Sequence, residues 1–232
     1  MATRGKKYIK AQQVVGAKEP MLVDKALATV KSAAYAKFDE SVDVHVNLGI
    51  DATKGDQAVR GSVVLPHGIG RKVRIIVFAK DKYADAATQA GADYVGTTDL
   101  IEKINGGWLD FDFAIATPDL MGAVGALAKV LGPRGLLPNK KTGTVTFDVA
   151  DVVKDLKKGR MFFKNDRSGL VHFTIGKVSF DPSKLQDNFV AFMKALASSR
   201  PSGAKGRFLQ KTTLSSTMGP GVLVELGDAY KV

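Results

Sequence analysis

The pattern of hydrophobic and polar positions near both ends of the chain differs from the pattern in its middle. Residues 42–50, VDVHVNLGI, alternate apolar and polar side chains, which predicts a strand with one buried and one solvated face. Residues 72–79, KVRIIVFA, form a continuous apolar run, which is typical of a strand buried on both faces. Alternation returns in residues 161–166 and 170–180, which predict a hairpin around the turn Asp166–Gly169.

The middle of the chain alternates strands with helices. Apolar residues recur at helical spacing in residues 81–92, 97–107 and 120–132, and short strands are expected at residues 93–96 and 111–119. This order predicts a parallel sheet with helices on both of its faces.

The two ends of the chain carry a different set of elements. Helices are expected at residues 24–36 and 181–201, and short strands at residues 62–66 and 222–224. Asp181 is the expected N-cap of the second helix, because the proline after it suits the first helical position.

The nested pattern predicts two domains, a discontinuous one built from residues 1–67 and 160–232 and an inserted one of residues 68–159. The 232-residue chain has a formal net charge of +11. The inserted part holds thirteen Lys/Arg and eleven Asp/Glu, a net of +2, which leaves a net of +9 on the two ends. The discontinuous domain therefore carries nearly all of the signal for a polyanionic partner, and nucleic acid is favoured over a membrane surface.

Composition also narrows the cellular setting. Cysteine is absent, which excludes disulfides, thiolate nucleophiles and cysteine-bound zinc and suits a reducing compartment. The first residues carry positive charge without an apolar run behind them, so no secretory signal is expected. The best apolar run, residues 120–128, falls short of the roughly 20 residues that span a bilayer. We expect a soluble cytoplasmic protein without a membrane partner.

Motifs assign no catalytic, cofactor or metal site. The glycines of HGIGRK, residues 67–72, precede a predicted strand, whereas a phosphate-binding loop needs them after the strand, at a helix N-terminus. His45 and His172 lie in alternating strands and can share a sheet face, but a metal would need a third ligand that the sequence does not identify. We therefore expect a protein that is not an enzyme.

Two segments have both a plain structural interpretation and a functional one. Residues 215–220, SSTMGP, form an uncharged elbow before a strand, which is either an ordinary turn or a contact point for RNA. Phe38 precedes the polar strand positions Ser41, Asp43 and His45. It is either a core residue or an aromatic platform beside side chains that read RNA. The residues alone leave both alternatives open.

Several segments, in the same order, resemble the large-subunit ribosomal protein L1 family of bacterial type. They include KFDESVDVHVNLGID, QAVRGSVVLPHGIGRKVRIIVFA, GRMFFKNDRSGLVHFTIGKVSF and two very specific motifs, LGPRGLLPN and SSTMGPG. The resemblance covers nearly the whole chain after its first ~20 residues. It implies an α+β domain, an α/β sandwich built from both chain ends, and an inserted three-layer, Rossmann-like α/β domain.

The resemblance also implies which residues bind RNA. They come from three segments that the family fold brings together on one sheet face: the KFDES segment with its strand, the NDRSG turn with its flanking strands, and the Thr-Met-Gly motif. In this sequence they are Lys37, Phe38, Ser41, Asp43, His45, Lys164, Asp166, Arg167, Ser168, His172, Thr217, Met218 and Gly219.

The function implied is that of a structural constituent of the large ribosomal subunit. The chain would bind the stalk of 23S rRNA near the tRNA exit site, assist release of deacylated tRNA and repress translation of its own mRNA. Expected partners are 23S rRNA, the protein's own mRNA, exit-site tRNA and other components of the large subunit. The alternatives are a general basic RNA- or DNA-binding protein and a nucleotide-binding α/β enzyme.

Overall fold

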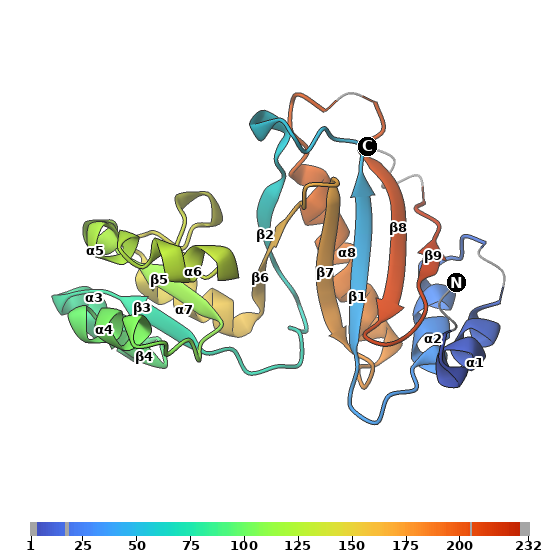
Figure 1. Cartoon of the computed structure of the whole chain (residues 1–232), viewed down its shortest axis with the longest axis horizontal. Helices are drawn as coiled ribbons and strands as arrows, with labels where there is room; N and C mark the ends of the chain where they lie inside the picture. Colours follow the sequence, from blue (N-terminus) through green and yellow to red (C-terminus); the bar gives the residue numbers. More distant parts are fainter. Residues whose placement is uncertain (1–3, 17–18, 205, 228–232) are drawn as a thin grey trace. The chain divides into compact units, whose positions relative to one another are not determined.

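The computed structural model describes residues 4–16, 19–204 and 206–227 and divides the chain into two compact units (Figure 1). Unit 1 is discontinuous and consists of Met1–Gly70 and Met161–Val232, whereas unit 2 is the continuous stretch Arg71–Arg160. These limits lie within three residues of those predicted from the sequence. No helix among the described residues is long and apolar enough to cross a membrane.

Unit 1 is built on a four-stranded antiparallel sheet with the order β7-β1-β8-β9. Its strands are β1 (Ser41–Leu48), β7 (Leu170–Lys177), β8 (Leu209–Ser216) and β9 (Val222–Val224). Buried and half-exposed residues alternate without interruption along β1, which confirms the predicted strand with one buried face.

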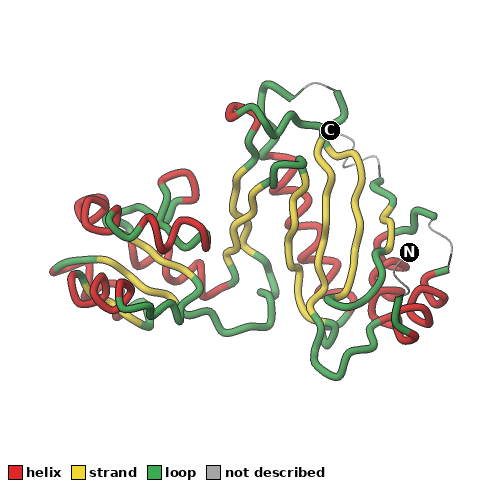
Figure 2. Tube along the Cα trace, in the orientation of Figure 1, coloured by secondary structure: helices red, strands yellow, loops and turns green. Residues whose placement is uncertain are grey.

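Helices cover one face of this sheet. In Figure 1, α8 lies behind β7 and β1, and Figure 2 shows the helices in red. The helices of unit 1 are α1 (Lys6–Val15), α2 (Val23–Ala33) and α8 (Pro182–Ser198). The apolar stripe of α8 fills the core, where the Phe192 ring stacks on that of Phe173 at 4.3 Å between centroids. The described residues of unit 1 place no helix on the opposite face.

Unit 1 contains a second, two-stranded sheet, and its pairing shows that the hairpin predicted for residues 161–166 and 170–180 is wrong. Strand β6 (Arg160–Lys164) pairs with β2 (Arg60–Val64) and not with β7. Asn165 explains the choice, because it holds Val59 by two hydrogen bonds, donating its N–H to the Val59 carbonyl (3.1 Å) and accepting the Val59 N–H on its side chain (2.8 Å). Only one bridge, between Asn165 and Val171, joins the two predicted hairpin strands.

Unit 2 contains a three-stranded parallel sheet with the order β4-β3-β5. Its strands are β3 (Ile75–Phe78), β4 (Tyr94–Gly96) and β5 (Phe113–Ala116). Its helices are α3 (Asp81–Gln89), α4 (Thr98–Asn105), α5 (Met121–Gly125), α6 (Ala128–Arg134) and α7 (Val149–Lys158). Short 3₁₀ turns lie at Pro118–Leu120 and Lys140–Thr142 here and at Gly55–Gln57 in unit 1.

The sheet of unit 2 is buried on both faces. Ile76 and Phe78 point into a core shared with α4, α5 and α6. Ile75 and Val77, equally buried, face the other way, towards the side where α3 packs against α7. The prediction of a strand buried on both faces is therefore confirmed for Ile75–Phe78.

The helix predicted at residues 120–132 is instead two short helices, α5 and α6, that meet at Leu127. The second continues through Pro133 and ends at Gly135, whose φ of 71° is the left-handed conformation that favours glycine. Helices α1 and α7 and strand β8 were not predicted from the sequence.

The segment at the boundary of the two units belongs to unit 1 because Asn188 of α8 holds it. This fully buried amide accepts a hydrogen bond from the His67 N–H (3.2 Å) and donates to the carbonyls of Gly68 (2.9 Å) and Ile175 (2.7 Å). These hydrogen bonds of Asn188 explain why unit 1 extends past residue 67.

We expect Asn188→Ala to destabilise unit 1 by about 1–3 kcal/mol, because it removes three hydrogen bonds and leaves the buried carbonyl of Ile175 without its partner. Hydrogen exchange of the β1 amides measures the stability of this unit directly. Gln186→Ala, an exposed change on the same helix, is the matched control and should be close to neutral. Equal exchange rates in the two variants would show that these hydrogen bonds are unimportant for stability.

Candidate nucleic-acid interface

The face of the four-stranded sheet opposite the helices is polar, and we call it the polar face. Strand pairing fixes its composition, because partners in register share one face: His45 lies opposite His172 and Thr213, and Asp43 lies opposite Thr174 and Ser215. Its members are Ser41, Asp43, His45, Asn47, His172, Thr174, Lys177, Lys211, Thr213 and Ser215.

Hydrogen bonds between neighbouring strands order these side chains. The Thr174 hydroxyl donates to the Asp43 carboxylate at 2.6 Å, and the Lys177 ammonium donates to the Ser41 hydroxyl at 2.9 Å. Each of these hydrogen bonds joins a side chain of β1 to a side chain of β7. The polar face therefore presents fixed donors and acceptors, which lowers the entropy cost of recognising a partner.

Two histidines share the middle of the polar face, as their alternating strands predicted. The Nδ1 atoms of His45 and His172 are 2.8 Å apart, and Nε2 of His45 is 3.1 Å from the Ser215 hydroxyl. Burial lowers the pKa of His45, and the neighbouring His172 lowers it further, against a smaller opposite effect of Asp43. His45 is therefore neutral at pH 7. Within the described residues no group of three His, Asp or Glu side chains is arranged to hold a metal ion.

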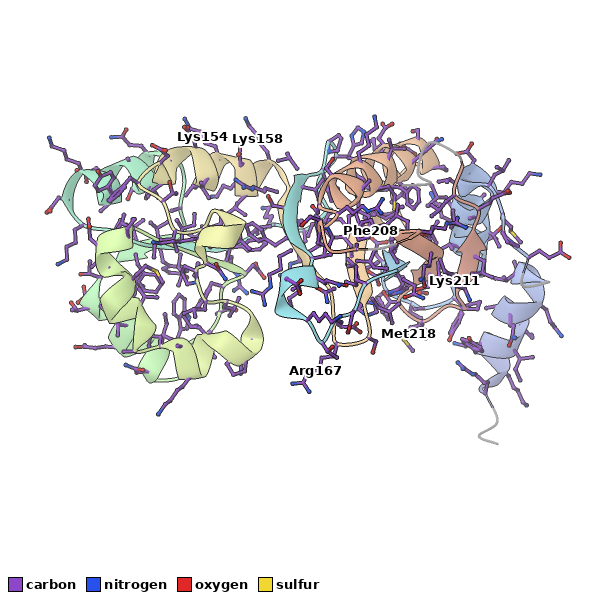
Figure 3. The ribbon with its side chains drawn as sticks, turned by 90° about the horizontal axis from the view of Figure 1, so that it is seen from above. Lys154, Lys158, Arg167, Phe208, Lys211 and Met218 are labelled. Atoms are coloured by element: carbon purple, nitrogen blue, oxygen red, sulfur yellow. The ribbon has the colours of Figure 1, made fainter. Side chains whose placement is uncertain are left out.

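The turn Asp166–Gly169 is shaped by its first residue. The Asp166 carboxylate accepts the N–H groups of Ser168 and Leu170, both at 2.8 Å, and Gly169 has a φ of 75°. The Leu170 N–H is the main cause that lowers the pKa of Asp166. Asp166 thus has a structural task, and Arg167 is left exposed at the tip, on the side of the sheet away from α8 (Figure 3).

The uncharged elbow is joined to the start of β1 by hydrogen bonds to Ser41 and Glu40. The Thr217 hydroxyl accepts the Ser41 N–H at 2.9 Å, and the Thr217 N–H donates to the Ser41 carbonyl at 3.1 Å. The Glu40 carboxylate, only 2% exposed, accepts the N–H groups of Tyr35, Ala36 and Met218 at 2.8–3.0 Å. One buried anion therefore fixes two loops against each other.

These hydrogen bonds decide what the elbow exposes. Because its main chain is anchored, Met218 projects outwards with 49% of its surface exposed, on the same side of the sheet as Lys211 (Figure 3). Gly219 does not have a positive φ; a Cβ at this position would lie 2.5 Å from the Ser216 hydroxyl. Glycine is therefore required by close packing and not by backbone conformation.

Phe38 is not a core residue. Its side chain is 56% exposed, and it belongs to the same loop as Lys37, two residues before the buried Glu40. The interpretation of Phe38 as an exposed platform is the one compatible with this position. Lys164 is exposed as well, but it ends β6 and so belongs to the two-stranded sheet.

The structure thus brings most of the predicted residues to one surface. Ser41, Asp43, His45 and His172 lie on the polar face, the elbow borders it at Ser41, and Asp166 lies 3.6 Å from His172 Nε2. Sequence reasoning missed the members that come from elsewhere, namely Asn47, Thr174, Lys177, Lys211 and Thr213. The hydroxyl-rich run LQKTTLSS of β8 was the available signal for two of them.

Comparisons with known proteins identify relatives of this chain. A family model described as the ribosomal protein L1p/L10e family matches residues 30–220. One relative, the large ribosomal subunit protein uL1 of Cutibacterium acnes, is 54% identical over 222 residues, which cover 96% of each chain.

We expect Glu40→Gln to destabilise unit 1 by about 1–3 kcal/mol at pH 7, because it replaces one of the two carboxylate oxygens by an NH₂ group, which cannot accept an N–H as that oxygen does. Burial raises the pKa of Glu40, but the N–H groups of Met218, Ala36 and Tyr35 outweigh it, so the folded pKa lies below the ordinary value. The loss of unfolding free energy relative to wild type should have its full size above about pH 4.3. It should vanish as the pH falls through the pKa that Glu40 has in the folded protein. Denaturation at several pH values tests this, with the exposed Glu225→Gln as control; a pH-independent difference would contradict it.

A second expectation concerns the histidine pair. His172→Gln removes the neighbouring imidazole but keeps the volume, so the pKa of His45 should rise while staying below about 6.5, because burial remains. An NMR titration of the imidazole resonances measures it. Thr213→Val, which changes no charge beside His45, should leave the titration as in wild type. A His45 pKa unchanged by His172→Gln would rule out the coupling.

Proposed function

Because this chain belongs to the ribosomal protein L1 family, we propose that the polar face and its bordering elbow bind the stalk of 23S rRNA near the tRNA exit site. Family membership itself makes the chain a structural constituent of the large ribosomal subunit, associated with the ribosome in the cytoplasm, and not an enzyme. Its partners are therefore ribosomal RNA and other components of the large subunit.

The observation that carries the proposal is an uncovered sheet face of fixed hydroxyls and imidazoles. Structured RNA is recognised by shape, by 2′-hydroxyls and by unstacked bases, which call for donors and acceptors at close range. The His45, Ser215 and Thr174 side chains supply these groups at set positions.

The elbow adds close approach and apolar contact. Thr217 and Gly219 are small, and no side chain in Ser215–Pro220 carries a charge that would hold a ribose or base at a distance. Met218 and Phe38 are exposed on the two loops that Glu40 joins, where they can pack on a base or sugar. We propose that the contacts made by the elbow give the binding its specificity for the stalk RNA.

Cations around the polar face supply affinity through phosphates. Lys211 and Arg167 are exposed, and Lys177 lies beside Ser41. Lys37 and Lys164 extend the positive charge beyond the sheet. Neutralised phosphates release counterions, so this part of the binding should depend strongly on salt.

Two finer roles are part of the same proposal. Attached to the stalk, the protein lies beside the exit site and assists release of deacylated tRNA. It also represses translation of its own mRNA, through a segment that mimics the rRNA site. If the mimic uses the same polar face, rRNA and mRNA exclude each other, and repression follows from an excess of protein over rRNA.

We expect Lys211→Ala to weaken binding to a stalk rRNA fragment and to reduce the magnitude of the slope of log affinity against log salt by about one. Lys194→Ala is the matched control: it removes the same charge from the exposed side of α8, across the sheet from the polar face. Its salt slope should equal that of wild type. Binding isotherms at three or more salt concentrations give both slopes.

The same measurement separates the proposal from its rival, a general basic nucleic-acid-binding protein. A random RNA duplex at matched salt should bind far more weakly than the stalk fragment, and a fragment of the protein's own mRNA should compete with the stalk for the protein. Equal affinity for stalk and random duplex, or equal effects of the two lysine substitutions, would overturn the assignment of the polar face.

A further inference from the structure

Unit 2 has a cavity at the point where its strand order reverses. The chain leaves the central strand β3 through α3 to β4 on one side, and returns through α4 to β5 on the other. The carboxyl ends of β3 and β5 are aligned, Phe78 beside Ala116, and the Thr117 N–H donates to the Phe78 carbonyl at 3.0 Å. In open α/β sheets such a reversal leaves a crevice in which ligands bind.

The cavity has about 370 Å³, within the range of small-ligand sites. It is lined by the segment that starts α3 and by the segment that follows β5: Lys80, Asp81, Lys82, Tyr83, Thr117, Asp119 and Leu120. Thr117 is the informative member. It is only 2% exposed and it lines the cavity, and its backbone N–H is bonded to the Phe78 carbonyl. Its position is therefore fixed, and its hydroxyl is a donor and acceptor that a ligand in the cavity can use.

The charged groups at the cavity match a phosphate next to a sugar. Lys80 and Lys82 are exposed beside the start of α3, whose first N–H groups have no side-chain cap. Asp119 and Asp81 add two carboxylates, which accept hydrogen bonds from hydroxyls but repel a bare anion. Asp81 is also the only non-glycine residue with a positive φ, 47°, among those described. A ligand that is anionic at one end and carries hydroxyls fits this set.

An aromatic platform borders the same cavity. The Tyr83 ring, which lines it, lies 5.6 Å from the Phe147 ring, and the two side chains are 40% and 46% exposed. Exposed aromatic pairs on a soluble surface are the surfaces on which unpaired bases stack. Phosphate-binding, hydroxyl-binding and base-stacking groups therefore occur together within one small region.

We propose that this cavity binds a single unstacked ribonucleotide. The base stacks on Tyr83, the phosphate lies at Lys80, Lys82 and the start of α3, and the ribose hydroxyls bond to Thr117 and Asp119. The ligand is either a free nucleotide or an unpaired residue of an RNA chain, which share this chemistry. The site is separate from the polar face, so it does not depend on the function proposed for unit 1.

The test is an NMR titration of the full-length protein with AMP, dAMP and a hexamer of uridine. AMP should give saturable shifts of the amides of residues 80–83 and 117–120, and dAMP should bind at least about twofold more weakly because one hydroxyl is missing. Saturation by AMP assigns the site to a free nucleotide. Saturation by the hexamer alone assigns it to RNA, and both results support the proposal.

Three variants decide whether the named groups act. Tyr83→Ala should weaken binding about 5- to 100-fold and Thr117→Val about 2- to 10-fold. Tyr94→Ala removes a comparably exposed tyrosine of the same unit, stacked edge-on to Trp108, and should bind as wild type does. The proposal fails if neither AMP nor the hexamer saturates these amides up to about 10 mM, if the shifts map to the polar face, or if Tyr83→Ala binds as well as Tyr94→Ala. Stalk RNA binding of the same proteins tests unit 1 separately.

Discussion

Every feature of the larger unit depends on β1 sending its apolar side chains to one face and its polar side chains to the other. The apolar face is covered by α2 and α8, and its burial stabilises the unit. No helix among the described residues covers the polar face, and several of its side chains bond to each other across the strands. Since a shift of one residue in register would exchange the two faces, the same core packing that stabilises the sheet also fixes the position of every polar group.

Glu40 extends this order from the sheet to the loops. A carboxylate that is 2% exposed would be costly to bury without partners, and three backbone N–H groups from two distant segments compensate it. The anion thereby holds residues 35–36 and the elbow in one arrangement. A basic protein thus builds the least charged part of its surface around a buried negative charge.

The two units solve the problem of presenting a ligand site in different ways. Unit 1 leaves a whole sheet face uncovered, which suits an extended partner such as folded RNA. Unit 2 packs helices on both faces of its sheet, and its cavity lies at the carboxyl ends of the strands, which suits a small ligand.

The sequence by itself determined the kinds of strand, the inserted order of the units and the charge difference, and the family resemblance predicted which segments bind RNA. Periodicity shows these features because it records which side of an element meets water. Only the tertiary structure decided that β6 pairs with β2, that Glu40 anchors Met218, and that Lys177, Lys211 and Ser215 join the polar face. Those outcomes depend on contacts between residues more than a hundred positions apart, and the local pattern of a chain contains no information on which distant segments will meet.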